Sequence, residues 1–355
     1  METYSGMSTK AAKTQLANYI FVYNTVMWTY KNPGIIKPKI FYFPLEETPE
    51  NITLRFMAFI INYLTQGRIT ISPTDLKSTD ERKPLSKEIL DIMDSLEFNS
   101  ILDHYESIVT FYDSHNIVGI NKTLCDYAQT HGKTHFRNIK VREVDELGIA
   151  KEVDRKVFDY YTPNDSNEYV IFIVDHISLL EPIKNMDLRE SICALSENCV
   201  TLRNRYNYIP VIIQQQSVET SNAEAVKNRK IRPTVAGLGD GKYTARDANM
   251  MIGICNPNAY ELPEYLGYDI TRLKGNIRFM EVVLNRDGEA NGICPLLFNG
   301  AINKFKEAPL SIETTELNQI CTYLEAERAS KREEPKKGVS FFMWAHQVIN
   351  NIINN

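Results

Sequence analysis

The stretch Tyr169–Asp175, with the sequence Y-V-I-F-I-V-D, carries the clearest information about the fold. It is an unbroken run of β-branched and aromatic residues, which is typical of a strand covered on both faces of a parallel sheet. The acid that ends the run is then expected at the carboxyl edge of that sheet, where open α/β sheets bind ligands. A helix-capping acid suits the same place, so Asp175 alone leaves a structural and a binding role equally open.

Apolar runs of the same kind recur along the chain and alternate with helix-like segments. The further runs are Lys39–Pro44, Ser107–Asp113, Ile209–Gln214 and Met250–Ile254. The helix-like segments are Thr14–Tyr30, Pro49–Leu64, Thr123–Gly132 and Leu188–Tyr206, with another helix expected around Pro84–Leu96. This alternation predicts an α/β fold in which a mostly parallel, twisted sheet is flanked by helices and joined by right-handed crossovers.

The pattern changes towards the end of the sequence. Asn276–Asn285 and Gly292–Phe298 have strand character, and the connection Arg286–Asn291 contains an Asp-Gly pair. Two strands joined in this way predict a C-terminal β-hairpin.

The predicted organisation is one α/β domain over residues 1–305, interrupted by a charged insertion at about 131–166. A helical tail is expected over residues 306–355, with a helix at Thr314–Arg332. The last stretch, Phe341–Ile353, has an apolar stripe at helical spacing, which docks either on this domain or on a partner.

The composition is that of an ordinary globular protein with a net charge of −5. The apolar runs are shorter than the ~18–20 residues of a membrane helix, and Met1 leads into polar residues rather than a secretory signal. A cytoplasmic protein of a bacterial cell or a phage-infected host, with no membrane partner, is therefore expected. The six cysteines are scattered without a C-x-x-C pair, which argues against a zinc cluster. Because the total charge is acidic, a nucleic-acid partner requires locally concentrated basic residues.

The sequence G-M-S-T-K-A-A-K-T near the start of the chain has the composition of a phosphate-binding loop. Such a loop needs small residues, so that backbone N–H groups face the phosphates, then a lysine and a hydroxyl that open a helix. Gly6, Ser8, Ala12, Lys13 and Thr14 supply these parts. The pattern G-x-x-x-x-G-K-S/T is not met, because an alanine holds the last glycine position and Gly6 is one residue early. The start of an ordinary helix rich in alanine and lysine is the alternative.

Polar groups also follow other predicted strands. Glu46 comes after the run Lys39–Pro44, where a carboxylate either polarises an attacking water or favours the N-terminus of the next helix. Gln216 is the last of three consecutive glutamines that close Ile209–Gln214, and an amide there can contact a terminal phosphate. Arg286 opens the hairpin connection, where an arginine either reaches into a neighbouring subunit or is solvated.

The order of these features resembles the motor domain of bacterial and phage replicative DNA helicases of the DnaB type, within the RecA-like superfamily. The resemblance runs from about Tyr4 to Phe305. Each of the following stretches resembles a motif of that family: Phe41–Met57 its S-L-E-M strand and helix, Tyr169–Leu180 its Walker B strand, Tyr208–Gln216 its P-V-x-x-x-S-Q segment, Arg232–Asn249 its R-P…D-A-D segment, and Phe279–Gly292 its last strand and K-Q-R-N-G hairpin.

The resemblance implies ATP and Mg²⁺ as cofactors and gives each residue a role. Gly6, Ser8, Ala12, Lys13 and Thr14 would bind the nucleotide, and Thr14 and Asp175 the metal. Glu46 would be the catalytic carboxylate, Gln216 the γ-phosphate sensor, and Arg286 an arginine finger that acts on the neighbouring subunit.

It also implies a hexameric ring that moves 5′ to 3′ on single-stranded DNA, with a primase or a helicase loader as further partners. Basic residues after the glutamines would contact the DNA phosphates: Lys227, Arg229, Lys230, Arg232 and Lys242. A solvated basic loop is the alternative of equal weight.

Some positions depart from the family pattern. Ala12 replaces a glycine, Leu284 replaces the hairpin lysine, and Gly237 and Gly239 replace an acid and an arginine. The family's N-terminal domain, linker helix and first strand have no counterpart in Met1–Ser5. Two alternatives therefore stay open: a catalytically degenerate RecA-fold paralogue that helps to assemble a replication complex, and a RecA- or KaiC-like ATPase.

Overall fold

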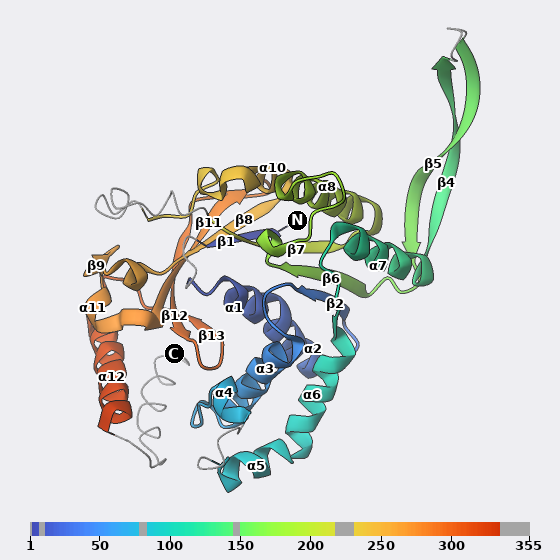
Figure 1. Ribbon diagram of the computed structural model, residues 1–355. Helices are drawn as coiled ribbons and strands as arrows, with labels where there is room; N and C mark the ends of the chain where they lie inside the picture. Colours follow the sequence, from blue (N-terminus) through green and yellow to red (C-terminus); the bar gives the residue numbers. More distant parts are fainter. Residues whose placement is uncertain (1, 7–10, 78–83, 145–149, 217–230, 334–355) are drawn as a thin grey trace.

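The computed structural model describes residues 2–6, 11–77, 84–144, 150–216 and 231–333, and its centre is one large sheet (Figure 1). The strand order in this part of the chain is β13-β12-β11-β8-β1-β7-β6-β2-β3. The strands are β1 (Glu2–Gly6), β2 (Lys37–Pro44), β3 (Val109–Phe111), β6 (Glu168–Asp175), β7 (Ile209–Gln215), β8 (Met250–Cys255), β11 (Ile277–Asn285), β12 (Ile293–Asn299) and β13 (Lys304–Glu307). Strands β1 to β8 of this sheet pair in parallel, and β11 to β13 are antiparallel. The predicted α/β fold and the terminal hairpin, β11–β12, are confirmed.

Strand β6 explains why the sheet is covered on both faces. It lies between β2 and β7, and every residue from Val170 to Asp175 is buried. Ile171 and Ile173 pack into one apolar cluster, and Val170, Phe172 and Val174 pack into another. Alternate side chains of a strand point to opposite faces, so an unbroken apolar run is what a strand between two helical layers requires.

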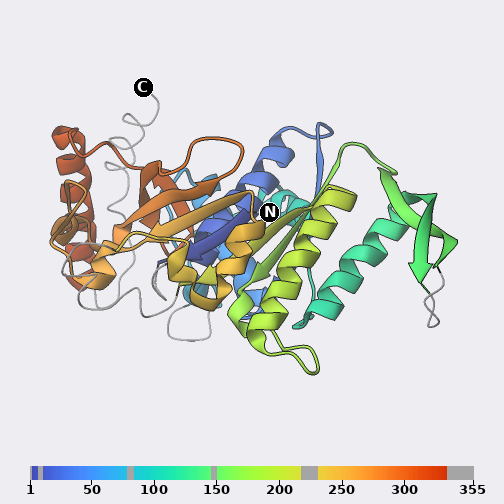
Figure 2. The same ribbon diagram turned by 90° about the horizontal axis from the view of Figure 1, so that it is seen from above.

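Helices from different parts of the sequence form the two layers (Figure 2). The first layer contains α1 (Lys13–Ala17), a π-helical turn at Asn18–Tyr23, α2 (Asn24–Lys31), α3 (Pro49–Leu64), α4 (Pro73–Leu76), α5 (Lys87–Met93) and α6 (Leu96–Ile108). The second contains α7 (Ile117–Thr130) and α8 (Leu188–Tyr206). The ends of α8 are marked in the sequence, because Asp187 and Glu190 form a capping box and Asn207 adopts the left-handed conformation after the last turn.

Three local predictions need correction. Helix α6 was not expected, and it extends to Ile108, so the strand predicted from Ser107 begins only at Val109. The Ser95 side chain accepts from the backbone N–H of Phe98 and starts α6, whose buried residues recur at helical spacing. Asn116 caps α7 in the same way, so α7 starts before Thr123. The few residues ahead of the phosphate loop do form a strand, β1, between β7 and β8.

The charged insertion is a long two-stranded antiparallel ribbon, here called the arm, which projects from the body (Figure 1). It consists of β4 (Gly132–Val144) and β5 (Ala150–Pro163). The base of the arm is held by α7 and α8: Tyr161 donates a hydrogen bond to the carbonyl of Ala128 at 3.0 Å, and its ring packs edge-on against Tyr206.

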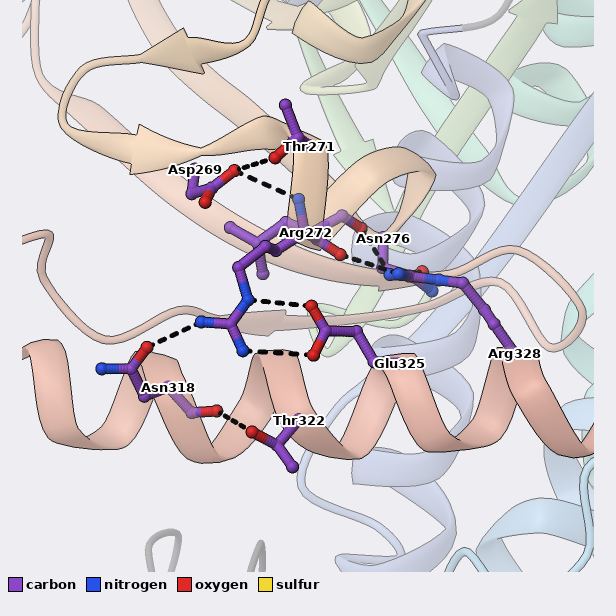
Figure 3. A network of polar contacts seen from close by, with 9 residues as sticks. Asp269, Thr271, Arg272, Asn276, Asn318, Thr322, Glu325 and Arg328 are labelled. Carbon is purple, nitrogen blue, oxygen red and sulfur yellow. Dashed lines mark hydrogen bonds and ion pairs between the residues drawn. The ribbon is translucent and has the colours of Figure 1, made fainter.

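The described part of the C-terminal tail packs on the body. Helix α12 (Thr314–Glu333) lies against α11 (Ile270–Leu273), and a polar network joins them (Figure 3). Arg272 donates to both carboxylate oxygens of Glu325, at 2.8 and 3.2 Å, and Arg328 donates to the carbonyl of Leu273 at 3.0 Å. A division between a motor domain and a tail at residues 305 and 306 stays a prediction. Phe341–Ile353 lies outside the described residues.

Short elements complete the body. They are η2 (Ile177–Leu179), η4 (Ala236–Lys242), α10 (Tyr243–Asp247), η5 (Pro257–Tyr260), β9 (Glu264–Tyr265), β10 (Tyr268–Asp269) and η6 (Lys274–Asn276). Among the helices of the described ranges, none combines the length and the apolar character that crossing a membrane requires.

Candidate functional site

A cavity of about 330 Å³ lies where β2, β6 and β7 end and α1 begins. Its lining residues are Ala12, Lys13, Thr14, Gln15, Glu46, Glu47, Arg55, Asp175, His176 and Gln215. This is the carboxyl edge of the parallel strands, where α/β sheets bind ligands. The fold therefore brings the loop residues Ala12, Lys13 and Thr14 together with the two strand-end acids, Glu46 and Asp175.

Asp175 is the most buried acid of the cavity, with 2 % of its surface exposed. The Thr14 hydroxyl donates to its Oδ1 at 3.0 Å, and the Tyr42 hydroxyl donates to its Oδ2 at 3.1 Å. Burial raises the pKa of Asp175 to about 7, although these hydrogen bonds and the Lys13 ammonium act in the opposite direction. Tyr42, which sequence reasoning missed, fixes the orientation of this carboxylate from the neighbouring strand β2.

Lys13 is also buried, with 8 % of its surface exposed, at the first turn of α1. Burial lowers the pKa of its ammonium group, while the charges of Asp175 and Glu46 raise it. The buried Arg278 donates to the carbonyl of Ala11 at 3.1 Å and so fixes the chain just before Lys13. A buried lysine at a helix N-terminus is suited to an anionic ligand, because it gains a partner that the protein alone supplies only in part.

Ala12 adopts a conformation that favours glycine, with φ 77° and ψ 38°. An L-residue in this left-handed region is less stable than glycine by roughly 1–2 kcal/mol. The structure therefore gives a physical reason why the related loops carry glycine at this position, and it shows that this chain accepts the alanine without losing the turn into α1.

Replacing Ala12 with glycine is expected to raise the thermal unfolding midpoint slightly and to tighten nucleotide binding. Relief of the left-handed strain outweighs the roughly 0.5–1 kcal/mol entropic penalty of glycine, and removal of Cβ gives a phosphate more room. Calorimetric titration and thermal denaturation measure both effects. Ala17→Gly is the matched control, because Ala17 has φ −60° and should be destabilised by the same change. Equal destabilisation of the two variants would contradict the strain argument.

Two pairs of charged residues surround the mouth of the cavity. Glu46, with 60 % of its side chain exposed, lies 3.3 Å from Nε2 of His176, whose side chain is 12 % exposed. Glu47 is bound by Arg55 from α3 at 2.8 Å and 3.0 Å. Burial lowers the pKa of His176, and the Glu46 charge opposes that change. Sequence reasoning gave no role to His176, although its position directly after Asp175 was a signal for it.

The three glutamines after β7 have different environments. Gln215 lines the cavity, whereas the Gln214 amide oxygen accepts from the Thr244 hydroxyl at 2.8 Å. Gln216 is buried and donates to the carbonyl of Thr234 at 2.9 Å, and it is not among the lining residues. Its amide oxygen has no partner in the described part of the chain. The sensor role proposed for Gln216 stays a prediction, and the geometry favours Gln215 for that position.

Arg286 lies outside this cavity, at the end of β11. Its backbone N–H donates to the carbonyl of Asn249 at 2.9 Å, and its guanidinium binds the carbonyl of Arg246. Leu284, in the place of the hairpin lysine, packs with a small cluster that includes Met251. An arginine that acts on a neighbouring subunit has to lie outside its own site, and the position of Arg286 agrees with that role without testing it.

The basic residues expected on the DNA fall into two groups. Lys227, Arg229 and Lys230 lie outside the described residues, as do Ser8 and its nearest neighbours in the loop. Arg232 binds both carboxylate oxygens of the buried Glu281, one of them at 3.0 Å. Lys242 is exposed at the end of η4. Of these two, Lys242 is the more available to a phosphate, because Arg232 already has a carboxylate partner.

The donor set of the cavity fits Mg²⁺. A hydroxyl and a carboxylate, those of Thr14 and Asp175, lie 3.0 Å apart, and hard oxygen ligands of this kind suit that ion. The buried carboxylate would also regain by metal binding the charge stabilisation that burial removes. Thr14 and Asp175 are therefore the residues that would hold the metal.

Comparisons with known proteins support the fold. No family model and no curated protein matches the sequence. The structure is similar to a solved helicase ATPase domain, with a TM-score of 0.58 and 14 % identity over 87 % of this chain and 84 % of that one. It is also similar to a chain of "The Structure Of A DnaB-Like Replicative Helicase And Its Interactions With Primase", with a TM-score of 0.57 and 14 % identity over 86 % of this chain and 56 % of that one. At this identity the similarity establishes a RecA-like fold of the kind found in helicase ATPase domains.

Proposed function

We propose that this chain is an ATP-hydrolysing motor that acts on single-stranded DNA as a hexameric ring, with nucleotide bound between neighbouring subunits. The observation that carries the proposal is the cavity in which Lys13, Thr14, Glu46 and Asp175 meet, although they are far apart in the sequence. The RecA-like fold, shared with helicase ATPase domains, supports a nucleoside triphosphate as the ligand and DNA as the track. A primase is a further proposed partner, because the second of those structures is described with one.

Each side chain has a task in such a site. Lys13 would bind the outer phosphates, and Thr14 and Asp175 would hold Mg²⁺, which neutralises negative charge on the phosphates when it is bound. Glu46 is exposed at the mouth of the cavity, where a carboxylate can orient and polarise a water for attack. His176 limits the movement of Glu46 from one side, and the Glu47–Arg55 pair provides a charged wall that is already neutralised.

Replacing Glu46 with glutamine is expected to lower the ATP turnover by roughly 10²–10⁴-fold and to leave ATP binding intact. The amide keeps the size of the side chain but cannot accept a proton. Turnover with and without single-stranded DNA, together with a nucleotide titration, measures both properties. Glu181→Gln, a change at an exposed carboxylate outside the cavity, is the control. Unchanged turnover in Glu46→Gln would remove Glu46 from the catalytic role, and turnover that ignores DNA would remove the motor function.

A non-catalytic assembly protein is the second candidate, and Ala12 is the observation that favours it. Its left-handed backbone and its Cβ lie where related loops have glycine, so phosphate binding is less favourable here than in a glycine loop. Nucleotide titration separates the two candidates. The motor proposal requires measurable affinity for ATP and ADP with Mg²⁺, and its absence in the full chain would favour the assembly role.

A further inference from the structure

The arm formed by β4 and β5 has more exposed apolar surface than an isolated ribbon can support. Its strands have 13 and 14 residues, so it is about 40 Å long at ~3.3 Å per residue. Phe136, Val144 and Tyr160 are all more than half exposed. A two-stranded ribbon in water is only marginally stable, and its outer edges carry unpaired backbone groups. The arm is therefore expected to be stabilised by a partner.

The strand register separates the arm into two unlike faces. Cross-strand partners share a face, and successive residues alternate between faces. The register pairs Ile139 with Arg155, Val141 with Val153 and Arg137 with Val157. These residues form one surface, here called the basic-apolar face, on which Ile139 is 37 % and Val153 is 41 % exposed.

The opposite face is mainly polar. It pairs Asn138 with Lys156, Lys140 with Asp154 and Arg142 with Glu152. The apolar side chains in the middle of the arm thus lie on the basic-apolar face, with arginines beside them. An apolar centre with a charged rim is the usual composition of a protein–protein interface.

A surface of complementary charge lies on the same chain, on α5 and α6 at the other side of the body (Figure 1). Five exposed acids form it, and they are here called the acidic ridge: Asp91, Asp94, Glu97, Asp103 and Glu106. None of them makes an ion pair with another of the described residues. Two leucines on these helices are also exposed, Leu90 at 46 % and Leu96 at 83 %.

We propose that the basic-apolar face of the arm binds the acidic ridge of a second copy of this chain. Leu90 and Leu96 would cover Ile139 and Val153, while Arg137 and Arg155 would face the acids of the ridge. The two surfaces differ, so the contact is head-to-tail and can repeat around a ring or along a filament. The proposal goes beyond nucleotide hydrolysis, and it can be tested without nucleotide.

Nucleic acid is the rival occupant of the arm, and the charges disfavour it. Glu143 lies on the basic-apolar face, 3.6 Å from Arg155, and Asp154 and Glu152 lie on the opposite face. Phosphates would be repelled by these carboxylates on either face, whereas an acidic protein surface with exposed leucines matches both the arginines and the apolar centre.

Reversing the arm charges with Arg137→Glu and Arg155→Glu is expected to weaken self-association of the full chain by roughly a hundredfold, because like charges would then face each other. Reversing the ridge with Asp94→Lys and Glu97→Lys should have the same effect. A chain that carries all four changes should assemble again, which a folding defect could not produce. Light scattering and sedimentation over a range of protein concentrations measure the assembly, and circular dichroism checks the fold.

Lys122→Glu with Lys184→Glu is the matched control, since both lysines are exposed on the body and the change in net charge is the same. The control should assemble like the unmodified chain. The proposal is overturned by a monomeric unmodified chain at every soluble concentration, by unaltered assembly of the arm variant, or by failure of the four-change chain to recover. Loss of single-stranded DNA binding in the arm variant, with assembly unchanged, would also overturn it and would assign the arm to nucleic acid.

Discussion

Replacing Arg286 with alanine is expected to lower the ATP turnover of the assembled protein by about 10³–10⁵-fold, with ATP affinity largely retained. The loss is large because a guanidinium placed on a transferring phosphoryl group stabilises charge that develops only in the transition state. Arg286 is exposed at the end of β11 and does not line the cavity of its own chain. Its effect on hydrolysis therefore has to come from a neighbouring subunit.

Mixing two inactive variants tests whether Arg286 acts between subunits. Arg286→Ala supplies an intact cavity, and Glu46→Gln supplies an intact arginine, so mixed assemblies should regain part of the turnover. Arg246→Ala is the control, because Arg246 is an exposed cation next to Arg286 that already binds Asp247 at 3.0 Å. No recovery on mixing, or an equal loss in the control, would show that Arg286 is not a finger acting in trans.

The parts of the fold that sequence reasoning predicted are those with a strong local pattern. The run before Asp175 is buried on both faces, and the Asp-Gly connection joins β11 and β12 as expected. The helix α6 was missed because its signal is a single cap at Ser95 within a polar stretch. The arm was recognised as an insertion but not as a ribbon, because its alternation of charged and apolar residues is not the pattern of a strand with one buried face.

The site shows a similar division. Lys13, Thr14, Glu46 and Asp175 were found because their positions at the ends of strands and the start of a helix are visible in the sequence. The choice between Gln215 and Gln216 depends on which side chain turns into the cavity at the end of β7. That orientation follows from the packing of Gln216 against Thr234, which is a long-range contact.

Replacing Asp175 with asparagine is expected to abolish hydrolysis and yet to stabilise the folded protein in Mg²⁺-free buffer at pH 8. Burial raises the pKa of Asp175 to about 7 from its ordinary value of 3.8, so ionising it at pH 8 costs on the order of 4 kcal/mol. Asparagine has a similar shape, can still accept from Thr14 or Tyr42, and carries no charge. Urea denaturation of both proteins measures the difference.

The dependence on pH follows from the direction of the shift. A carboxyl whose folded pKa is raised favours folding below its unfolded pKa, and this advantage is lost as the pH rises through the folded value. The advantage of asparagine over aspartate should therefore be absent near pH 3, grow from about pH 4 to pH 7, and stay constant above. Mg²⁺ with ATP should raise the stability of the unmodified chain more than that of Asp175→Asn, since only the carboxylate can hold the ion with Thr14. A variant that is less stable than the unmodified chain at pH 8 would mean that the ionised carboxylate is well solvated, and the case for Asp175 as a buried metal ligand would fail with it.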